Sequence, residues 1–72
     1  MNRVVAFDIL SEASYRYEGL LYVALQSKKI SEEEYLTKAK ELDGILADIG
    51  MSDYQNMLKL AGQFDAKMVV LQ

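Results

Sequence analysis

The sequence of 72 residues contains no cysteine, no histidine, no proline and no tryptophan. Without cysteine the chain forms no disulfide and offers no thiolate, which fits a protein of the cytoplasm, and we expect that location. Without histidine it lacks the usual general base near neutral pH and the commonest zinc ligand. Without proline, helix formation is free to extend along the whole chain.

A strong charge of either sign is also absent. The chain carries 11 acidic and 8 basic residues, a net charge of −3, whereas nonspecific binding of nucleic acid needs a cationic surface. No apolar run approaches the about 18 residues of a membrane-spanning helix, and Asp8 interrupts the N-terminal apolar run too early for a signal peptide. We therefore expect no membrane association and little affinity for nucleic acid.

Arrangements of residues that carry catalysis are missing as well. Acid–base catalysis needs carboxylates that converge in a cleft, but neighbouring acids such as Glu33 and Glu34 fall at a predicted helix start, where the helix dipole and solvent account for them. No glycine-rich phosphate loop is present. We expect a protein that is not an enzyme and that uses no cofactor and no metal.

Apolar side chains, in contrast, are plentiful, since 51% of the residues are hydrophobic. A domain of this length buries only about 60% of the surface that its unfolded chain exposes, so it is marginally stable as a monomer. The number of apolar side chains is larger than the interior of one small domain can bury. We expect part of the surface to be buried in a homo-oligomer, a dimer or larger.

Apolar residues recur in steps of three and four, which predicts helices at about residues 2–29, 32–49 and 53–70 within a single domain, 1–72. The expected fold is all-α: a helical hairpin plus a third helix, resembling a three-helix bundle that oligomerisation completes. In a second interpretation, 3–7 and 67–71 form short terminal β-strands, because these runs are rich in β-branched residues. The predicted seams are Ala6, Leu10, Ala13, Tyr17, Leu20 and Ala24; Tyr35, Ala39, Leu42, Leu46 and Ile49; and Tyr54, Met57, Ala61, Phe64, Met68 and Leu71.

Capping residues mark the predicted helix boundaries. Ser31 and Glu34 have the spacing of a capping box at the start of the second helix, so the hairpin is expected to bend at 29–31 and to bring the first two seams together. Gly50 follows the last apolar position of that helix and suits a left-handed C-terminal cap. Ser52 and Gln55 have the spacing of a second capping box, ahead of the third helix.

The segment that reads LQSKKISEEEY, from Leu25 to Tyr35, and its continuation to Leu42 resemble the SHOCT-type short helical hairpin. That family has a leucine-bearing helix, a turn with the pattern basic-Gly-Ile-Ser/Thr-Glu-Glu-Glu-aromatic, and a lysine-rich helix that ends in leucine. Lys29 stands where the family has glycine, and the resemblance covers about residues 20–46. It implies a hairpin and, as for the family, a role in oligomerisation or binding.

Tyrosine is frequent, with five in the chain, and its apolar ring with a polar tip is enriched at protein interfaces. Tyr15 and Tyr22 are seven residues apart, so they share one helix face, and with Phe7 they are predicted to form an exposed contact strip. Tyr54 is a fourth interface candidate. Gly19, between the two tyrosines, permits a close backbone approach. The alternative is that these aromatic residues form the rim of the core.

The sequence thus leads to the hypothesis of a small regulatory module that binds proteins. It would self-associate through helix faces and could act as an inhibitor or adaptor of a target protein, like small acidic proteins of phages and bacteria. The alternative is an oligomer that binds nucleic acid or a small ligand, because residues 47–66 resemble a helix-turn-helix in which Gln55 and Asn56 could read adenine edges.

Overall fold

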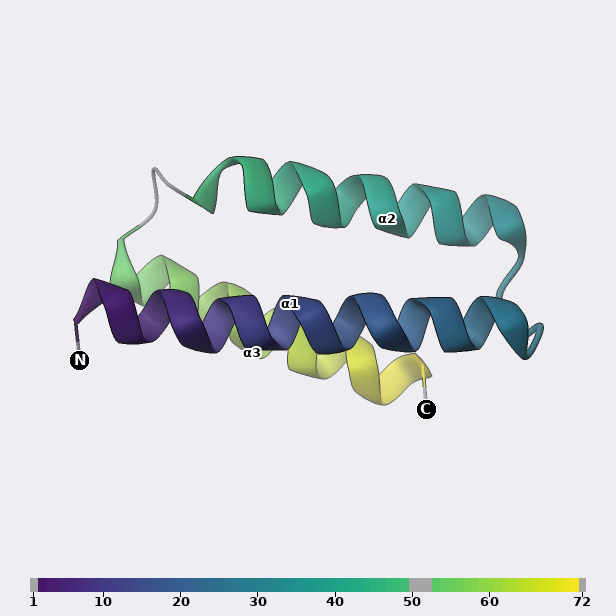
Figure 1. Cartoon of the computed structure of the whole chain (residues 1–72), viewed down its shortest axis with the longest axis horizontal. Coiled ribbons are helices and arrows are strands. Elements are labelled where there is room, and N and C mark those ends of the chain that lie inside the picture. The colour runs from purple at the N-terminus through teal and green to yellow at the C-terminus, as the bar shows by residue number, and fades with distance from the viewer. Residues whose placement is uncertain (1, 50–52, 72) are drawn as a thin grey trace.

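The computed structural model describes residues 2–49 and 53–71 of the chain. Three helices make up most of it: α1 spans Arg3–Gln26, α2 spans Glu32–Ala47 and α3 spans Tyr54–Leu71. Figure 1 shows α2 running back antiparallel to α1, and α3 then lying beside α1 in the same direction. The predicted all-α, three-helix architecture is confirmed.

Both ends of the described chain are helical, so the alternative of terminal β-strands is wrong. Residues 3–7 belong to α1 and residues 67–71 to α3. The β-branched residues there are overruled by the helical period that continues through them, since Ala6 and Met68 are both buried. An isolated two-stranded ribbon would have been marginal in comparison.

The first helix is shorter than predicted at its C-terminal end. It begins after Asn2, whose side-chain oxygen accepts a hydrogen bond of 3.0 Å from the Val5 N–H. It ends at Gln26, three residues before the predicted end. The Ser27 hydroxyl there donates to the Val23 carbonyl at 2.9 Å, and such a side-chain bond to the preceding turn competes with continuation of the helix.

A left-handed residue, Lys28, closes α1 with a φ of 64°. Its N–H donates to the Leu25 carbonyl at 3.1 Å, and the Lys29 N–H donates to the Ala24 carbonyl at 2.9 Å. This pair of bonds is a Schellman motif, whose left-handed position usually holds glycine. The hairpin therefore bends at 27–28 and not first at 29–31, and its left-handed position falls on Lys28.

The second helix begins where the sequence predicted and ends early. The Ser31 hydroxyl accepts a hydrogen bond of 3.1 Å from the Glu34 N–H and lies 3.5 Å from the Glu34 carboxylate. Three glutamates in the first turn face the positive end of the helix dipole. The helix ends at Ala47, two residues before the predicted end, with Asp48 at the C-cap. The cap predicted at Gly50 lies outside the described residues.

The third helix is capped one residue later than predicted. The Asp53 carboxylate accepts a hydrogen bond of 2.8 Å from the Asn56 N–H, the bond of an N-cap residue. Ser52 lies outside the described residues. Gln55 lies in the first turn, where its side-chain amide contacts the Tyr54 hydroxyl at 3.5 Å.

The buried core is formed mainly by α1 and α3, which pack against each other more extensively than α1 and α2 do. Alanines at the contact let the two helices approach closely, and the Tyr17 and Phe64 rings pack with centroids 5.3 Å apart. Leu21 is buried, whereas Leu20, predicted for the seam, is only half-buried. The buried apolar residues are Ala6, Leu10, Ala13, Tyr17, Leu21, Ala24, Leu42, Met57, Ala61, Phe64 and Met68.

The second helix contributes little to this core. Leu42 is its one fully buried residue among those described, and its other seam residues are half-buried. The first two seams therefore meet as expected, but the contact between α1 and α2 is the smaller one. The Ser31 turn directs α2 back along the bundle, but α3 covers most of the buried face of α1.

Candidate interaction surface

Tyr15 and Tyr22 lie together on the outer face of α1, as their spacing predicted. Their side chains are 81% and 55% exposed. With Tyr35, from the first turns of α2, they line a hollow of about 390 Å³ whose other walls are Glu18 and Gly19. The structure thus places three tyrosines from two helices around one open depression.

Gly19 lines this hollow, and its position makes no close packing contact within the chain. A Cβ atom built at this position meets no atom within 4 Å. The close backbone approach predicted for Gly19 is therefore not made inside the bundle. The absent side chain leaves space on the surface instead.

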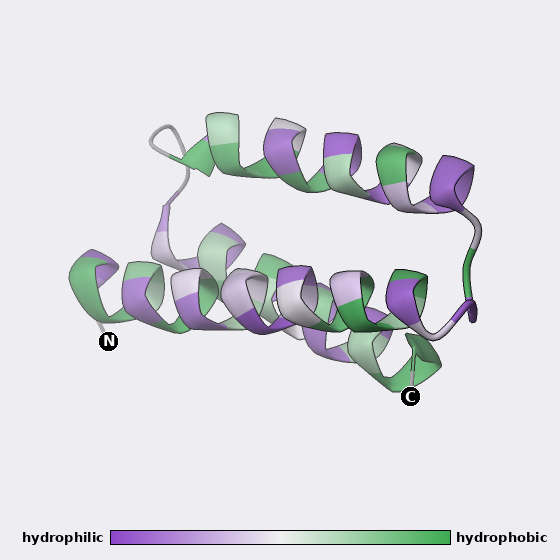
Figure 2. Ribbon diagram, turned by 45° about the vertical axis from the view of Figure 1, so that its right-hand side comes forward, coloured by the Kyte–Doolittle hydropathy of each residue, from purple (hydrophilic) through white to green (hydrophobic). Residues whose placement is uncertain are grey.

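A second hollow, of about 570 Å³, lies on the other side of Gly19, in the groove between α1 and α3. Val23 and Val69 are 58% and 71% exposed there, beside the half-buried Leu20 and the edge of Met68. Figure 2 shows that hydrophobic residues also colour the last turn of α3. Because Gly19 lines both hollows, they join into one mostly apolar surface.

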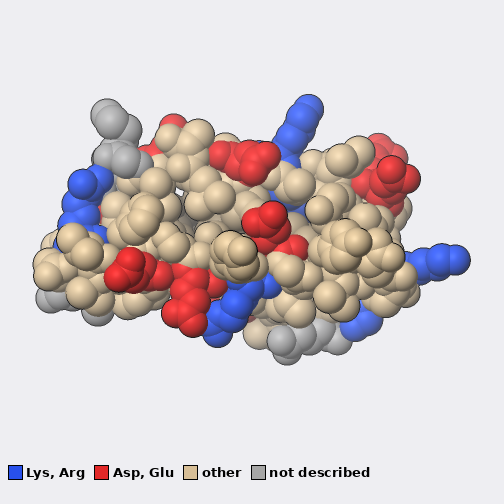
Figure 3. Space-filling model, in the orientation of Figure 1, with Lys and Arg blue, Asp and Glu red and all other residues tan. Residues whose placement is uncertain are grey.

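This combined surface is called the Gly19 surface below. It is lined by Tyr15, Arg16, Glu18, Gly19, Leu20, Tyr22, Val23, Tyr35, Asp65, Met68 and Val69. Figure 3 shows the α1 side of the molecule, where separate acidic and basic groups interrupt broad uncharged areas.

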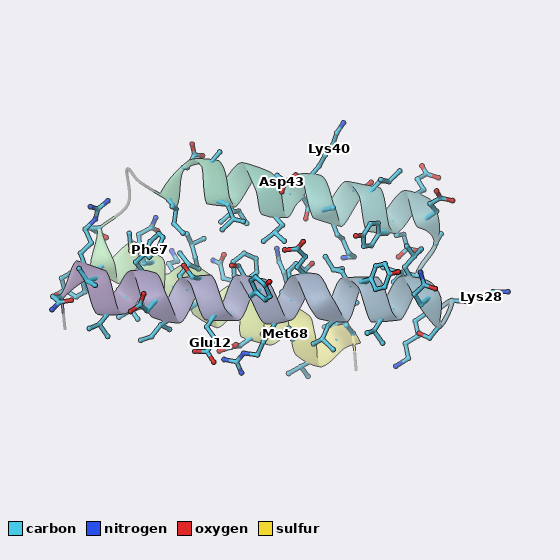
Figure 4. All side chains as sticks on the ribbon, viewed as in Figure 1. Phe7, Glu12, Lys28, Lys40, Asp43 and Met68 are labelled. Atoms are coloured by element: carbon cyan, nitrogen blue, oxygen red, sulfur yellow. The ribbon has the colours of Figure 1, made fainter. Side chains whose placement is uncertain are left out.

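The other two interface candidates lie elsewhere. Phe7 lines a different hollow, of about 370 Å³, with Arg3, Val4, Ile49 and Met57, and Figure 4 shows it near the N-terminal end of α1. Tyr54 is 39% exposed in the first turn of α3. The predicted strip therefore reduces to Tyr15 and Tyr22.

Sequence reasoning missed Tyr35, Val23 and Val69 as members of the surface. Tyr35 was assigned to the core seam, but it is only half-buried. The two valines lie on different helices, so no spacing within one helix relates them. The off-seam position of Val23 was the one available signal, and it gained meaning only once α3 was placed beside α1.

Charges on and beside the Gly19 surface are of both signs. Arg16 pairs with Glu12 across one helical turn at 3.6 Å, and both side chains are mostly exposed. Such an exposed pair contributes little to stability, so Arg16 can exchange its partner at low cost. Glu18 and Asp65 are the acidic groups that line the surface. The surface therefore carries one cation and two acids among its lining residues.

The chain also exposes more surface than its mass predicts. A compact monomer of 8.2 kDa exposes about 4,500 Å², and this chain exposes 5046 Å². Its radius of gyration is 12.6 Å, against about 11 Å for a compact domain of this length. Both values agree with the elongated shape of the chain, whose extents are 39 × 20 × 13 Å.

Comparison of the chain with protein-family models, with curated proteins and with solved structures found no match in any of the three. Within residues 2–49 and 53–71, no group of three or more acidic side chains is arranged to hold a metal ion. None of the helices, as far as they are described, is long and apolar enough to span a membrane. The described residues thus form a small three-helix protein that carries an apolar and aromatic surface around Gly19.

Proposed function

We propose that this chain is a protein-binding module whose first partner is a second copy of itself, docked through the Gly19 surface. The observation that carries the proposal is the pair of exposed tyrosines beside Gly19, where the missing side chain leaves open space on the surface. In a two-fold symmetric contact the α1 helices of the two copies cross at Gly19, where the missing side chain lets the backbones approach. Tyr15 and Tyr22 of each copy then cover apolar surface of the other.

The presence of both charge signs on the Gly19 surface supports self-association over a partner of uniform charge. In a symmetric crossing near Gly19, Arg16 of each copy comes close to the acidic groups of the other. Each ion pair adds little affinity at an exposed rim but disfavours wrong orientations. The contact is confined to the linings of two open hollows, so we expect a weak, reversible dimer of micromolar affinity.

Sedimentation velocity tests the proposal. Chain concentrations from about 1 to 500 μM span the dissociation constants expected for a weak dimer. The expected result is a concentration-dependent shift from one chain of 8.2 kDa to twice that mass. The double variant Tyr15→Ser and Tyr22→Ser should remain monomeric. Tyr54→Ser, which changes a tyrosine outside the surface, should dimerise like the parent.

A folded monomer at every concentration would refute self-association. A double variant that dimerises normally would show that another surface makes the contact. Far-ultraviolet circular dichroism of each variant separates loss of association from loss of fold, because the substituted side chains are exposed in the single chain.

A further inference from the structure

A further cavity, separate from the Gly19 surface, lies where the α1–α2 turn, the first half of α2 and the end of α3 meet. Its volume is about 410 Å³, and it is more enclosed than the tyrosine hollow. Three lysines from three different segments line it: Lys29 from the turn, Lys38 from α2 and Lys67 from α3. They are three of the eight cations in a chain of net negative charge. We call it the lysine cavity.

Burial distinguishes two of these lysines from the other charged residues. Lys38 and Lys67 are half-buried, whereas every other lysine and arginine is exposed, and so is every aspartate and glutamate. The half-buried charged side chains of this acidic protein are therefore both positive and both line one cavity. Because like charges gathered in a concave site raise the local concentration of counter-ions, the cavity favours an anion.

Lys38 and Lys67 form no ion pair with the residues that the structure describes. The Lys29 ammonium donates to the Leu71 carbonyl at 3.4 Å, at the negative end of the α3 dipole. The Lys67 ammonium lies 5.9 Å from the Tyr17 ring centroid and 5.8 Å from that of Phe64. Lys38 makes no hydrogen bond or ion pair with the residues that the structure describes.

One acidic residue, Glu34, lines the cavity against the three cations. It is exposed, and its carboxylate lies beside the Ser31 hydroxyl at the cap of α2. A net positive lining therefore results even with Glu34 ionised.

The rest of the lining is mostly apolar and comes from Ile30, Val70, Leu71 and the Tyr17 ring. Burial, with a smaller contribution from nearby Glu41, raises the pKa of the Tyr17 phenol above its ordinary value. That phenol therefore keeps its proton at neutral pH and can act as a hydrogen-bond donor.

We infer that the lysine cavity binds a small amphipathic anion, an apolar body that carries one carboxylate, sulfonate or phosphate group. The anionic group would lie between the ammonium groups of Lys38 and Lys67, and the apolar body would lie against the aliphatic wall. Pockets that combine an apolar lining with a few convergent polar groups are typical of small-molecule sites. The site shares no lining residue with the Gly19 surface, so it stands or falls independently of the dimer.

Titration with 2-naphthoate, followed by amide chemical shifts in two-dimensional NMR, tests the inference. The neutral analogue 2-naphthalenemethanol and inorganic phosphate are the two control ligands, one lacking the charge and the other the apolar body. We expect 2-naphthoate to bind with a dissociation constant of about 1 mM or tighter, as its size permits, and to shift amides around residues 29–30, 38 and 67–71. Both control ligands should bind at least about fivefold more weakly.

Two lysines of α2 provide the matched variants. Lys38→Gln removes a cation that lines the cavity and should weaken 2-naphthoate about three- to tenfold. Lys40→Gln removes a cation that points away from the bundle (Figure 4) and should leave the affinity unchanged. Lys67→Gln should weaken binding as Lys38→Gln does, but Lys38→Gln is decisive because its cation makes no contact that the fold requires.

Equal affinity for 2-naphthoate and either control ligand would overturn the inference, as would an affinity of Lys38→Gln within twofold of the parent. Amide shifts confined to the Gly19 surface would likewise overturn it.

Discussion

Replacing each of three helical glycines by alanine separates the stability of the single chain from its self-association. Gly19, Gly44 and Gly62 lie inside α1, α2 and α3, and a Cβ at any of them meets no atom within 4 Å. Alanine is therefore accommodated without a clash in each case. It should stabilise the folded monomer by about 1 kcal/mol, the difference in helix propensity between the two residues. For a chain of this length that raises the Tm by about 4–8 °C.

Self-association should respond to Gly19→Ala alone. A methyl group added at Gly19 separates two crossing helices, and overpacking of a close contact costs about 1–3 kcal/mol. The dimer dissociation constant should therefore rise about fivefold or more. Gly44→Ala and Gly62→Ala give the same gain in propensity away from the lining residues of that surface, and their dimers should be as tight as the parent's.

Two measurements on the same three variants give the answer. Thermal unfolding at a concentration below the dimer dissociation constant reports the monomer alone, because at higher concentration association adds to the apparent stability. Sedimentation equilibrium then gives the dissociation constant. If Gly19→Ala dimerises as tightly as the other two variants, the two copies do not cross at Gly19. If the monomer of Gly19→Ala is less stable than the parent, the space beside Gly19 is not open.

Two further predictions concern the end of α1 and its buried tyrosine. Lys28→Gly should stabilise the chain by about 1 kcal/mol in urea unfolding, because glycine adopts the left-handed conformation without the steric cost that lysine incurs; Lys29→Gly, whose φ is not positive, should show no such gain. For Tyr17, burial raises the phenol pKa in the folded chain above the ordinary 10.0, so the folded state holds the proton more tightly. Its contribution to stability is complete below about pH 10 and is lost as the pH rises toward the folded-state pKa. The difference in unfolding free energy between the parent and Tyr17→Phe should therefore be constant from pH 7 to 9 and change above pH 10, and a constant difference throughout would contradict the shift.

The helical period along the chain was sufficient to predict the three helices and most of the core. The period of three and four residues identified Met57, Ala61, Phe64 and Met68 correctly, since all four are buried. It placed Leu20 in the seam where the structure buries Leu21. A stripe of period 3.5 shifts gradually around a helix of 3.6 residues per turn, so neighbouring positions far along the helix are hard to distinguish.

The ends of the helices, and which helix packs against which, depend on interactions that the spacing of apolar residues does not reveal. The left-handed conformation at Lys28 contradicts the usual preference for glycine, so the Schellman motif had no signal in the sequence. Part of the candidate surface was predicted, because the spacing of Tyr15 and Tyr22 places both on one face of a single helix. Tyr35 and Val69 joined them through the placement of α2 and α3 around α1, which is a tertiary relation.

The pairing of the first helix with the last also determines how the chain can fold. Most of the buried face of α1 is covered by α3, so the α1–α2 hairpin by itself leaves Leu10, Tyr17 and Leu21 without their main covering. Contacts between distant parts of a chain form only after the intervening loop has been closed at an entropic cost. We therefore expect the isolated hairpin, residues 3–47, to be far less helical than the same residues in the whole chain.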